Sequence, residues 1–200
     1  MVNLLRLPRR FIAQTSGYAM TETMMIAPLL IVLCGTLVET TLMMFQWNQT
    51  VKALQVGARR AAVSTPLTDI SALTSYDSAV GQGDPVPMPG SSGTPRSVSC
   101  GAGADPCDTD ALARLMNGSG LTGIQDIAPF IGPENIRVTY QESGLGYVGR
   151  PFGPVLTVTL EVRNLAFDLL LIDDLVPVNI PAHPVAITSE DLSDCEGTCS

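Results

Sequence analysis

A long uncharged apolar run lies near the N-terminus. From Thr23 the chain reads TMMIAPLLIVLCGTLV, and after Glu39 the apolar character continues as TTLMMF to Phe45. A helix that crosses a bilayer needs roughly 20 mostly apolar residues. Residues 23–45 are therefore long enough to span a membrane if Glu39 lies near one interface, and Trp47 follows where interfacial aromatic residues are expected. A buried helix of a soluble domain is the alternative.

The helical pattern continues beyond the apolar run. Val51, Leu54 and Ala58 recur at helical spacing, and charged side chains lie on or beside the opposite face. This pattern predicts one helix over about residues 20–63, with its first half in lipid and an amphipathic second half outside. Pro28 is expected to kink this helix, because proline removes one backbone hydrogen bond.

The remaining sequence predicts a small α+β domain. Residues 81–106 are rich in Gly, Pro and Ser and read as loop, and Asp108 or Thr109 caps a short helix, DALARLMN. Alternating apolar positions predict antiparallel strands, which we expect to pack against the exposed half of the long helix. The strands are expected at 135–142, 155–163 and 183–188. The chain thus divides into a basic cytoplasmic leader (1–17), a transmembrane helix (18–45), an amphipathic extension (46–64), a loop-rich segment with short helices (65–134), and a sheet with an acidic, Cys-containing tail (135–200).

The distribution of charge predicts the orientation of the chain in the membrane. Residues 1–22 carry three arginines and one acidic residue, Glu22, so the positive-inside rule keeps this end in the cytoplasm. Residues 64–200 carry 5 basic and 17 acidic side chains, a net of −12 (5 − 17), within a chain of net charge −8. Such an acidic surface repels phosphate backbones, so nucleic acid is not an expected partner.

The cysteines agree with export. Cys34 lies inside the apolar run, where it reads as a small packing residue. The other four fall in two close pairs, which in an oxidising compartment indicate two disulfides. Local pairing closes the shortest loops, but a tie between the tail and the central loop remains open. These disulfide candidates are Cys100, Cys107, Cys195 and Cys199.

Catalysis has little support in the sequence. The one histidine, His183, has no nucleophile beside it in the sequence, and no hydrolase, metalloprotease or phosphate-loop motif is present. A zinc site lacks CxxC spacing. Asp105, Asp108 and Asp110 could ligate calcium, but a cluster at a helix N-terminus that favours the helix dipole is the better reading. We therefore predict a non-enzymatic protein without metal or cofactor.

Two residues at the mouth of the apolar run stand out. Glu22 is a carboxylate whose burial in lipid would cost roughly 2.5–3.5 kcal/mol, although it could also stay wet at the interface. Gly17 precedes it by five positions, just after a basic stretch. If a peptidase cut after Gly17, Tyr18 would carry a new ammonium group that could neutralise Glu22 of a neighbouring subunit.

At these residues the chain resembles the TadE-like family, the pseudopilin-type components of tight-adherence (Flp) pilus systems. The resemblance covers about residues 9–63, and the matching positions are Arg9, Arg10, Gly17, Glu22, Pro28, Glu39 and the segment 58–62. It implies export, cleavage after Gly17 by an aspartic prepilin peptidase, and a role in pilus biogenesis.

Together, these features predict a pilin-like subunit of the bacterial inner membrane, with its C-terminal domain in the periplasm or outside the cell. Its expected partners are other pilin or pseudopilin subunits, the inner-membrane assembly machinery, the prepilin peptidase and membrane lipid. The alternatives are an uncleaved signal-anchored periplasmic protein with no pilus role and a metal-binding exterior domain.

Overall fold

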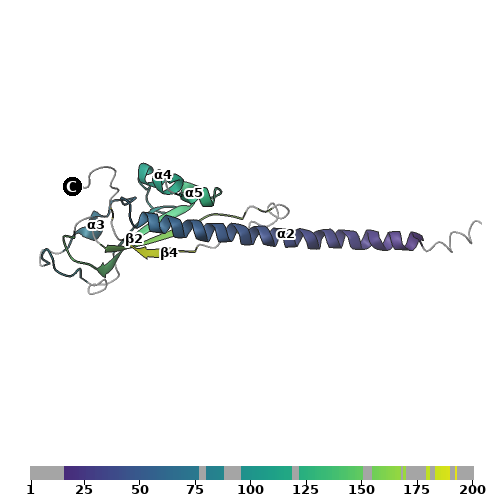
Figure 1. The fold of residues 1–200 in the computed structure, drawn as a ribbon, viewed down its shortest axis with the longest axis horizontal. Helices are drawn as coiled ribbons and strands as arrows, with labels where there is room; N and C mark the ends of the chain where they lie inside the picture. The colour runs from purple at the N-terminus through teal and green to yellow at the C-terminus, as the bar shows by residue number, and fades with distance from the viewer. Residues whose placement is uncertain are drawn as a thin grey trace, which may run out of the picture.

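A long helix projects from a small sheet domain (Figure 1). The structure is a computed structural model, and it describes residues 16–76, 80–87, 96–118, 122–150, 155–167, 169, 179–180, 183–189 and 192. It combines the helix with an antiparallel four-stranded sheet. The α+β fold predicted from the sequence is therefore confirmed.

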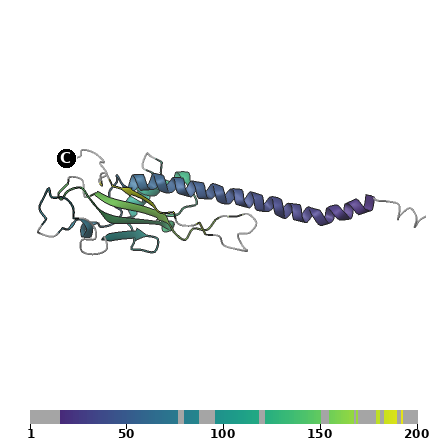
Figure 2. The same cartoon turned by 90° about the horizontal axis from the view of Figure 1, so that it is seen from below.

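The long helix, α2, runs from Ser16 to Ala61 and includes Pro28. At 1.5 Å per residue its 46 residues extend about 69 Å. Figure 2 shows that it curves gently toward its N-terminal end. Within the described residues it is the one helix that is long and apolar enough to cross a membrane, by length and composition. From Ala53 onward its apolar face is buried against the rest of the molecule, which we call the head.

Four strands form the sheet of the head, in the order β1-β2-β3-β4 with antiparallel neighbours. Apolar and polar positions alternate along the two central strands, so one face of the sheet carries Ile136, Val138, Tyr140, Val158 and Leu160 into the core. The strands are β1 (Ser97–Gly101), β2 (Ile136–Leu145), β3 (Val155–Val162) and β4 (Val185–Thr188).

Strand β1 corrects the prediction that residues 81–106 are all loop. It pairs with β2 from Ser97↔Gln141 to Gly101↔Arg137. Its sequence, SVSCG, is too short and too polar to show an alternating pattern, and turn residues surround it. The stability of this strand comes from its partner and not from its own propensity.

The helix α2 lies along one face of the sheet, and two short helices pack beside it (Figures 1 and 2). Leu54, Ala58 and Ala61 of α2 are fully buried in this core. Gly57 allows the closest approach, since a Cβ atom there would lie 2.8 Å from both Ile124 Cδ1 and Leu160 Cδ2. The remaining helices are α3 (Ser71–Thr74), α4 (Thr109–Asn117), α5 (Ile124–Ile127) and the 3-10 turn η2 (Pro133–Asn135).

Candidate functional site

The residues singled out for processing lie in the first turns of α2. Gly17, Tyr18 and Glu22 are all helical, and Tyr18 is 77% exposed. Positions four apart share one face of a helix, so Tyr18 and Glu22 lie on the same side. Thr21 Oγ1 donates a hydrogen bond to the Tyr18 carbonyl oxygen at 2.8 Å. An accessible carboxylate therefore lies one turn from the residue that would follow a cut.

The half of α2 between Met20 and Phe45 presents apolar side chains on all sides. Met25 is 84% exposed and Ile31 is 72% exposed. The threonines within it turn their hydroxyl groups inward, because Thr36 donates to the Leu33 carbonyl and Thr40 to the Thr36 carbonyl, both at 2.8 Å. Such bonds satisfy the hydroxyl groups within the helix. This surface, the apolar half of α2, suits lipid or other apolar helices far better than water.

Two carboxylates lie within the apolar half, one near each of its ends. Glu22 and Glu39 are 17 positions apart (39 − 22), which is about 26 Å along the helix axis. This spacing approaches the roughly 30 Å hydrocarbon thickness of a bilayer. Glu39 is only 2% exposed, although Val38 and Thr40 beside it are exposed. The sequence indicated the position of Glu39 but gave no signal of its burial.

The C-terminal strand contacts α2 close to the end of the apolar half. The rings of Trp47 and His183 meet edge to face, with centroids 4.5 Å apart. His183 lies just before β4 and is solvent-exposed. The contact joins residues far apart in the chain, so sequence reasoning missed it, and it gives the histidine a packing partner.

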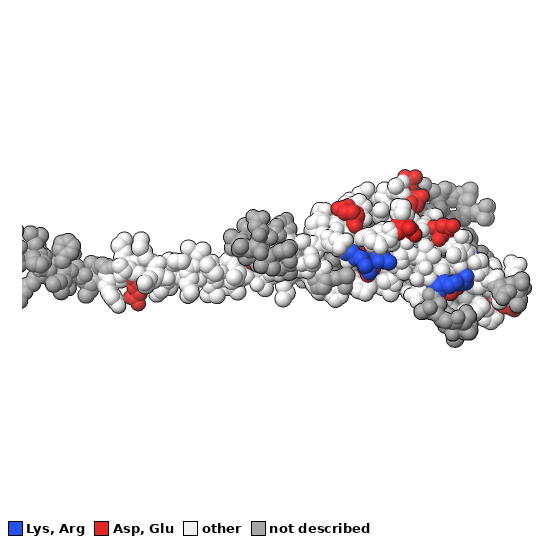
Figure 3. Space-filling model, turned by 180° about the vertical axis from the view of Figure 1, so that it is seen from behind, with Lys and Arg blue, Asp and Glu red and all other residues white. Residues whose placement is uncertain are grey.

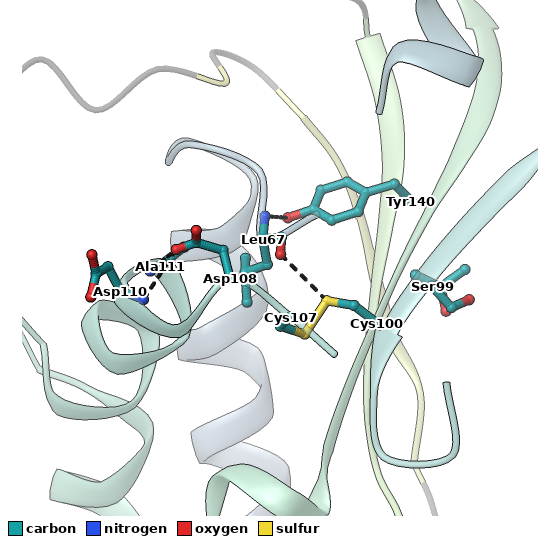
Figure 4. Close-up of a disulfide and its surroundings, with 9 residues drawn as sticks. Leu67, Ser99, Cys100, Cys107, Asp108, Asp110, Ala111 and Tyr140 are labelled. Carbon is teal, nitrogen blue, oxygen red and sulfur yellow. Dashed lines mark hydrogen bonds between the residues drawn. A yellow bond between two sulfur atoms is a disulfide. The ribbon is translucent and has the colours of Figure 1, made fainter. Parts of the chain in front are cut away.

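A disulfide and a buried tyrosine hold the loop that follows α2 (Figure 4). Cys100 and Cys107 form the disulfide, and Cys100 is fully buried near the Leu67 carbonyl. Leu67 N–H donates to Tyr140 Oη at 3.1 Å, and burial raises the pKa of Tyr140 to about 12. Cys195 and Cys199 lie outside the described residues.

The acidic cluster before α4 serves the helix terminus. The Asp108 side chain accepts hydrogen bonds from the backbone N–H groups of Asp110 at 3.0 Å and Ala111 at 2.9 Å. This is the N-cap arrangement that satisfies otherwise unbonded donors of the first turn. The geometry therefore gives Asp108 a structural role in α4.

Comparison with known proteins bears on the N-terminal helix. The family model described as TadE-like protein matches residues 17–59. This segment is similar to the TadE-like family. The resemblance predicted from the sequence is thus confirmed over these residues. No curated protein and no solved structure matches the chain.

The TadE-like segment begins at Gly17 and ends at Arg59. It contains the whole apolar half of α2 and the first turns that pack on the head, but none of the strands. The match covers 43 residues (59 − 17 + 1) of the 200-residue chain, so it describes the N-terminal helix alone. The comparison with known families says nothing about strands β1–β4, which lie beyond the matched residues.

Proposed function

We propose that this chain is a non-catalytic pilin-like subunit that takes part in assembling a tight-adherence pilus. The apolar half of α2 holds it in the inner membrane, with residues 1–17 in the cytoplasm and the head on the other side. One observation carries the proposal. The TadE-like match covers a helix whose most apolar 18-residue stretch is only 6% buried. A surface of this kind needs lipid or other helices around it.

Processing after Gly17 is the first step of the proposed mechanism. A prepilin peptidase at the cytoplasmic face would remove the basic leader and leave Tyr18 with a free ammonium group. Glu22 lies one turn away, near the positive end of the helix dipole. An ammonium group from a neighbouring subunit would complete its neutralisation, which offsets the cost of moving a carboxylate into an apolar environment.

Assembly follows from lateral packing of the apolar half of α2. In the membrane, lipid covers this surface, and in the growing structure the helices of other pilin subunits replace the lipid. Pro28 lies six residues after Glu22 and would let the helix bend to fit curved neighbours. No bond is made or broken in this step, so the subunit acts by shape, apolar contact and charge neutralisation.

N-terminal sequencing and intact mass of the chain purified from membranes test this proposal. The expected product begins at Tyr18 and has lost 17 residues. Gly17→Leu should block the cut, whereas Thr36→Leu, which adds the same side chain within the apolar half, should leave it intact. Glu22→Gln should be processed normally but reduce incorporation into pili, scored by sheared surface fractions.

An uncleaved signal anchor makes the opposite prediction. Its chain would begin at Met1, and Gly17→Leu would change nothing. A wild-type protein that retains its leader, together with Glu22→Gln cells that assemble normal pili, would reject the pilin-like mechanism and leave a tethered head.

A further inference from the structure

Three cations on α2 have no carboxylate partner in the part of the chain that the structure describes. Arg96 pairs with Glu142, and Arg137 and Arg163 both pair with Glu161. The three cations without such a pair belong to the last turns of α2, where one guanidinium nitrogen, Nη1 of Arg60, is buried and has no hydrogen-bond partner among the described residues. A buried charged group without a partner costs free energy, so an external anion is favoured there. These cations are Lys52, Arg59 and Arg60.

The three cations surround an apolar groove between α2 and the segment that contains α5. The groove has a volume of about 530 Å³. Val56, Val63 and Ile127 supply its apolar walls, and Val63 is 46% exposed. We call it the neck groove, and it is lined by Lys52, Val56, Arg59, Arg60, Val63, Thr122 and Ile127. It combines apolar contact with positive charge, in a chain whose residues after 63 carry a net −12 (5 − 17).

The membrane is not in reach of the two arginines of this groove. Arg59 lies 14 positions beyond Phe45 (59 − 45), which is about 21 Å along the helix axis. The headgroup layer extends only roughly 5–8 Å beyond the hydrocarbon on each side of a bilayer. If the span ends near Phe45, as the proposed function requires, lipid phosphates stop well short of Arg59 and Arg60. The anion that fits is therefore the acidic surface of a protein.

The head itself presents such a surface. Asp110 of α4, Asp126 of α5 and Glu134 of η2 are exposed, and α4 contacts both of the other elements. None of the three forms an ion pair within the described residues. We call them the acidic edge. Figure 3 shows acidic side chains gathered on one side of the head.

We propose that the neck groove is the docking site for the acidic edge of a second copy of this chain. The inference rests on the proposed function, because helices anchored side by side in one membrane hold neighbouring heads at similar heights. Apolar walls supply contact area, and the three cations meet the three carboxylates of the edge. Complementary charge of this kind fixes register and speeds association. A groove-to-edge contact repeated from copy to copy joins different surfaces and can extend beyond a pair.

Photo-crosslinking of the full-length chain in lipid nanodiscs tests the docking. A benzophenone amino acid replaces Val63 in the groove, and in the control it replaces Gln55, an exposed residue of α2 that does not line the groove. We expect a dimer-sized adduct from position 63, mapped by mass spectrometry to α4, α5 or η2 of the other copy. The yield should fall as salt is raised.

Charge-reversed variants distinguish a loss of docking from a failure to fold. Lys52→Glu with Arg59→Glu changes two exposed side chains and leaves the half-buried Arg60 in place. This variant, and a second carrying Asp110→Lys with Glu134→Lys, should each lose about tenfold in self-crosslinking. Mixing the two, distinguished by tags, should restore the adduct in the mixed pair, which a misfolded variant could not do.

Three results would overturn the docking proposal. They are a crosslink unchanged by charge reversal, a mixed pair that is not restored, and an adduct to lipid or to a different protein. The N-terminus of each sample is sequenced in parallel. Loss of the crosslink with normal processing at Gly17 would reject only the docking proposal. A retained leader with an intact crosslink would reject only the proposed pilin-like mechanism.

Discussion

At the scale of single residues, Tyr140 joins the sheet to the end of α2. Its ring is fully buried, and its hydroxyl oxygen accepts the Leu67 N–H. No other acceptor for that N–H is found among the described residues. The phenol therefore satisfies a buried backbone donor at the point where the chain leaves the long helix.

Replacing Tyr140 by Phe should lower the free energy of unfolding of the head by about 1–3 kcal/mol, because it leaves the Leu67 N–H without its acceptor. Tyr147→Phe is the control, since Tyr147 is 47% exposed. Urea unfolding of the full-length protein in detergent, followed by far-UV circular dichroism, measures both. Equal stability of the two variants would contradict this role of the hydroxyl group.

The same tyrosine adds a pH dependence with a defined sign. Its folded pKa is about 12 against an ordinary value of 10.0, so the folded state binds this proton more tightly than the unfolded state. The contribution is fully present below pH 10 and is lost as pH rises toward 12. Tyr140→Phe should flatten that part of the stability profile.

Local residue roles could be predicted from the sequence, and distant ones could not. The cap by Asp108 was visible because the cap and the helix that it serves are adjacent in the chain. Tyr140 and Leu67 are 73 positions apart, and Trp47 meets His183 across most of the chain. The amino-acid sequence alone does not mark such pairs, because any apolar strand position could face any part of the core.

At the scale of elements, α2 has two surfaces along one continuous helix. Its apolar half exposes mostly apolar side chains, whereas its C-terminal part buries a stripe of small residues against the head. The sequence predicted both, since a long apolar run and a helical period are strong signals. It did not predict β1, whose pairing depends on β2 and which carries too few apolar positions to show a period.

The close packing of α2 on the head depends on Gly57. We expect Gly57→Leu to destabilise the head by about 1–3 kcal/mol or more, because the new side chain would collide with Ile124 and Leu160. Gln55→Leu introduces the same side chain on the exposed face of the same helix and should stay close to wild type. Thermal unfolding in detergent measures both. A Gly57→Leu melt that matches the Gln55→Leu melt would show that α2 does not pack here as described.

At the scale of the whole molecule, the chain joins an apolar half-helix to an acidic head. The first is exposed over most of its length, and the second carries the sheet, the disulfide and the core. The TadE-like match ends at Arg59, within α2 and before the first strand of the sheet. The helix thus carries the family resemblance, and the strands of the head lie outside the matched residues.

The division of the chain into an apolar half-helix and a head predicts how the Cys34 thiol reacts with a maleimide. Its side chain is exposed on the helix surface but lies in the middle of the apolar half. In spheroplasts, a membrane-impermeant maleimide should leave Cys34 unlabelled, because lipid surrounds the thiol and the reagent does not enter the bilayer. The test uses a chain with Cys195 and Cys199 changed to Ser, and Cys100 and Cys107 stay in their disulfide.

A Gln55→Cys variant in the same background serves as the matched control. Gln55 lies ten positions beyond Phe45, about 15 Å past the end of the apolar half, on an exposed face of α2. A head outside the cytoplasm therefore requires that the thiol introduced by Gln55→Cys be labelled from the outside while Cys34 is not, and detergent should make both reactive. Labelling of Cys34 without detergent would place the apolar half in water, and failure to label either thiol without detergent would place the head on the cytoplasmic side. Because the two positions share one helix, the pair of results fixes both the depth and the direction of insertion.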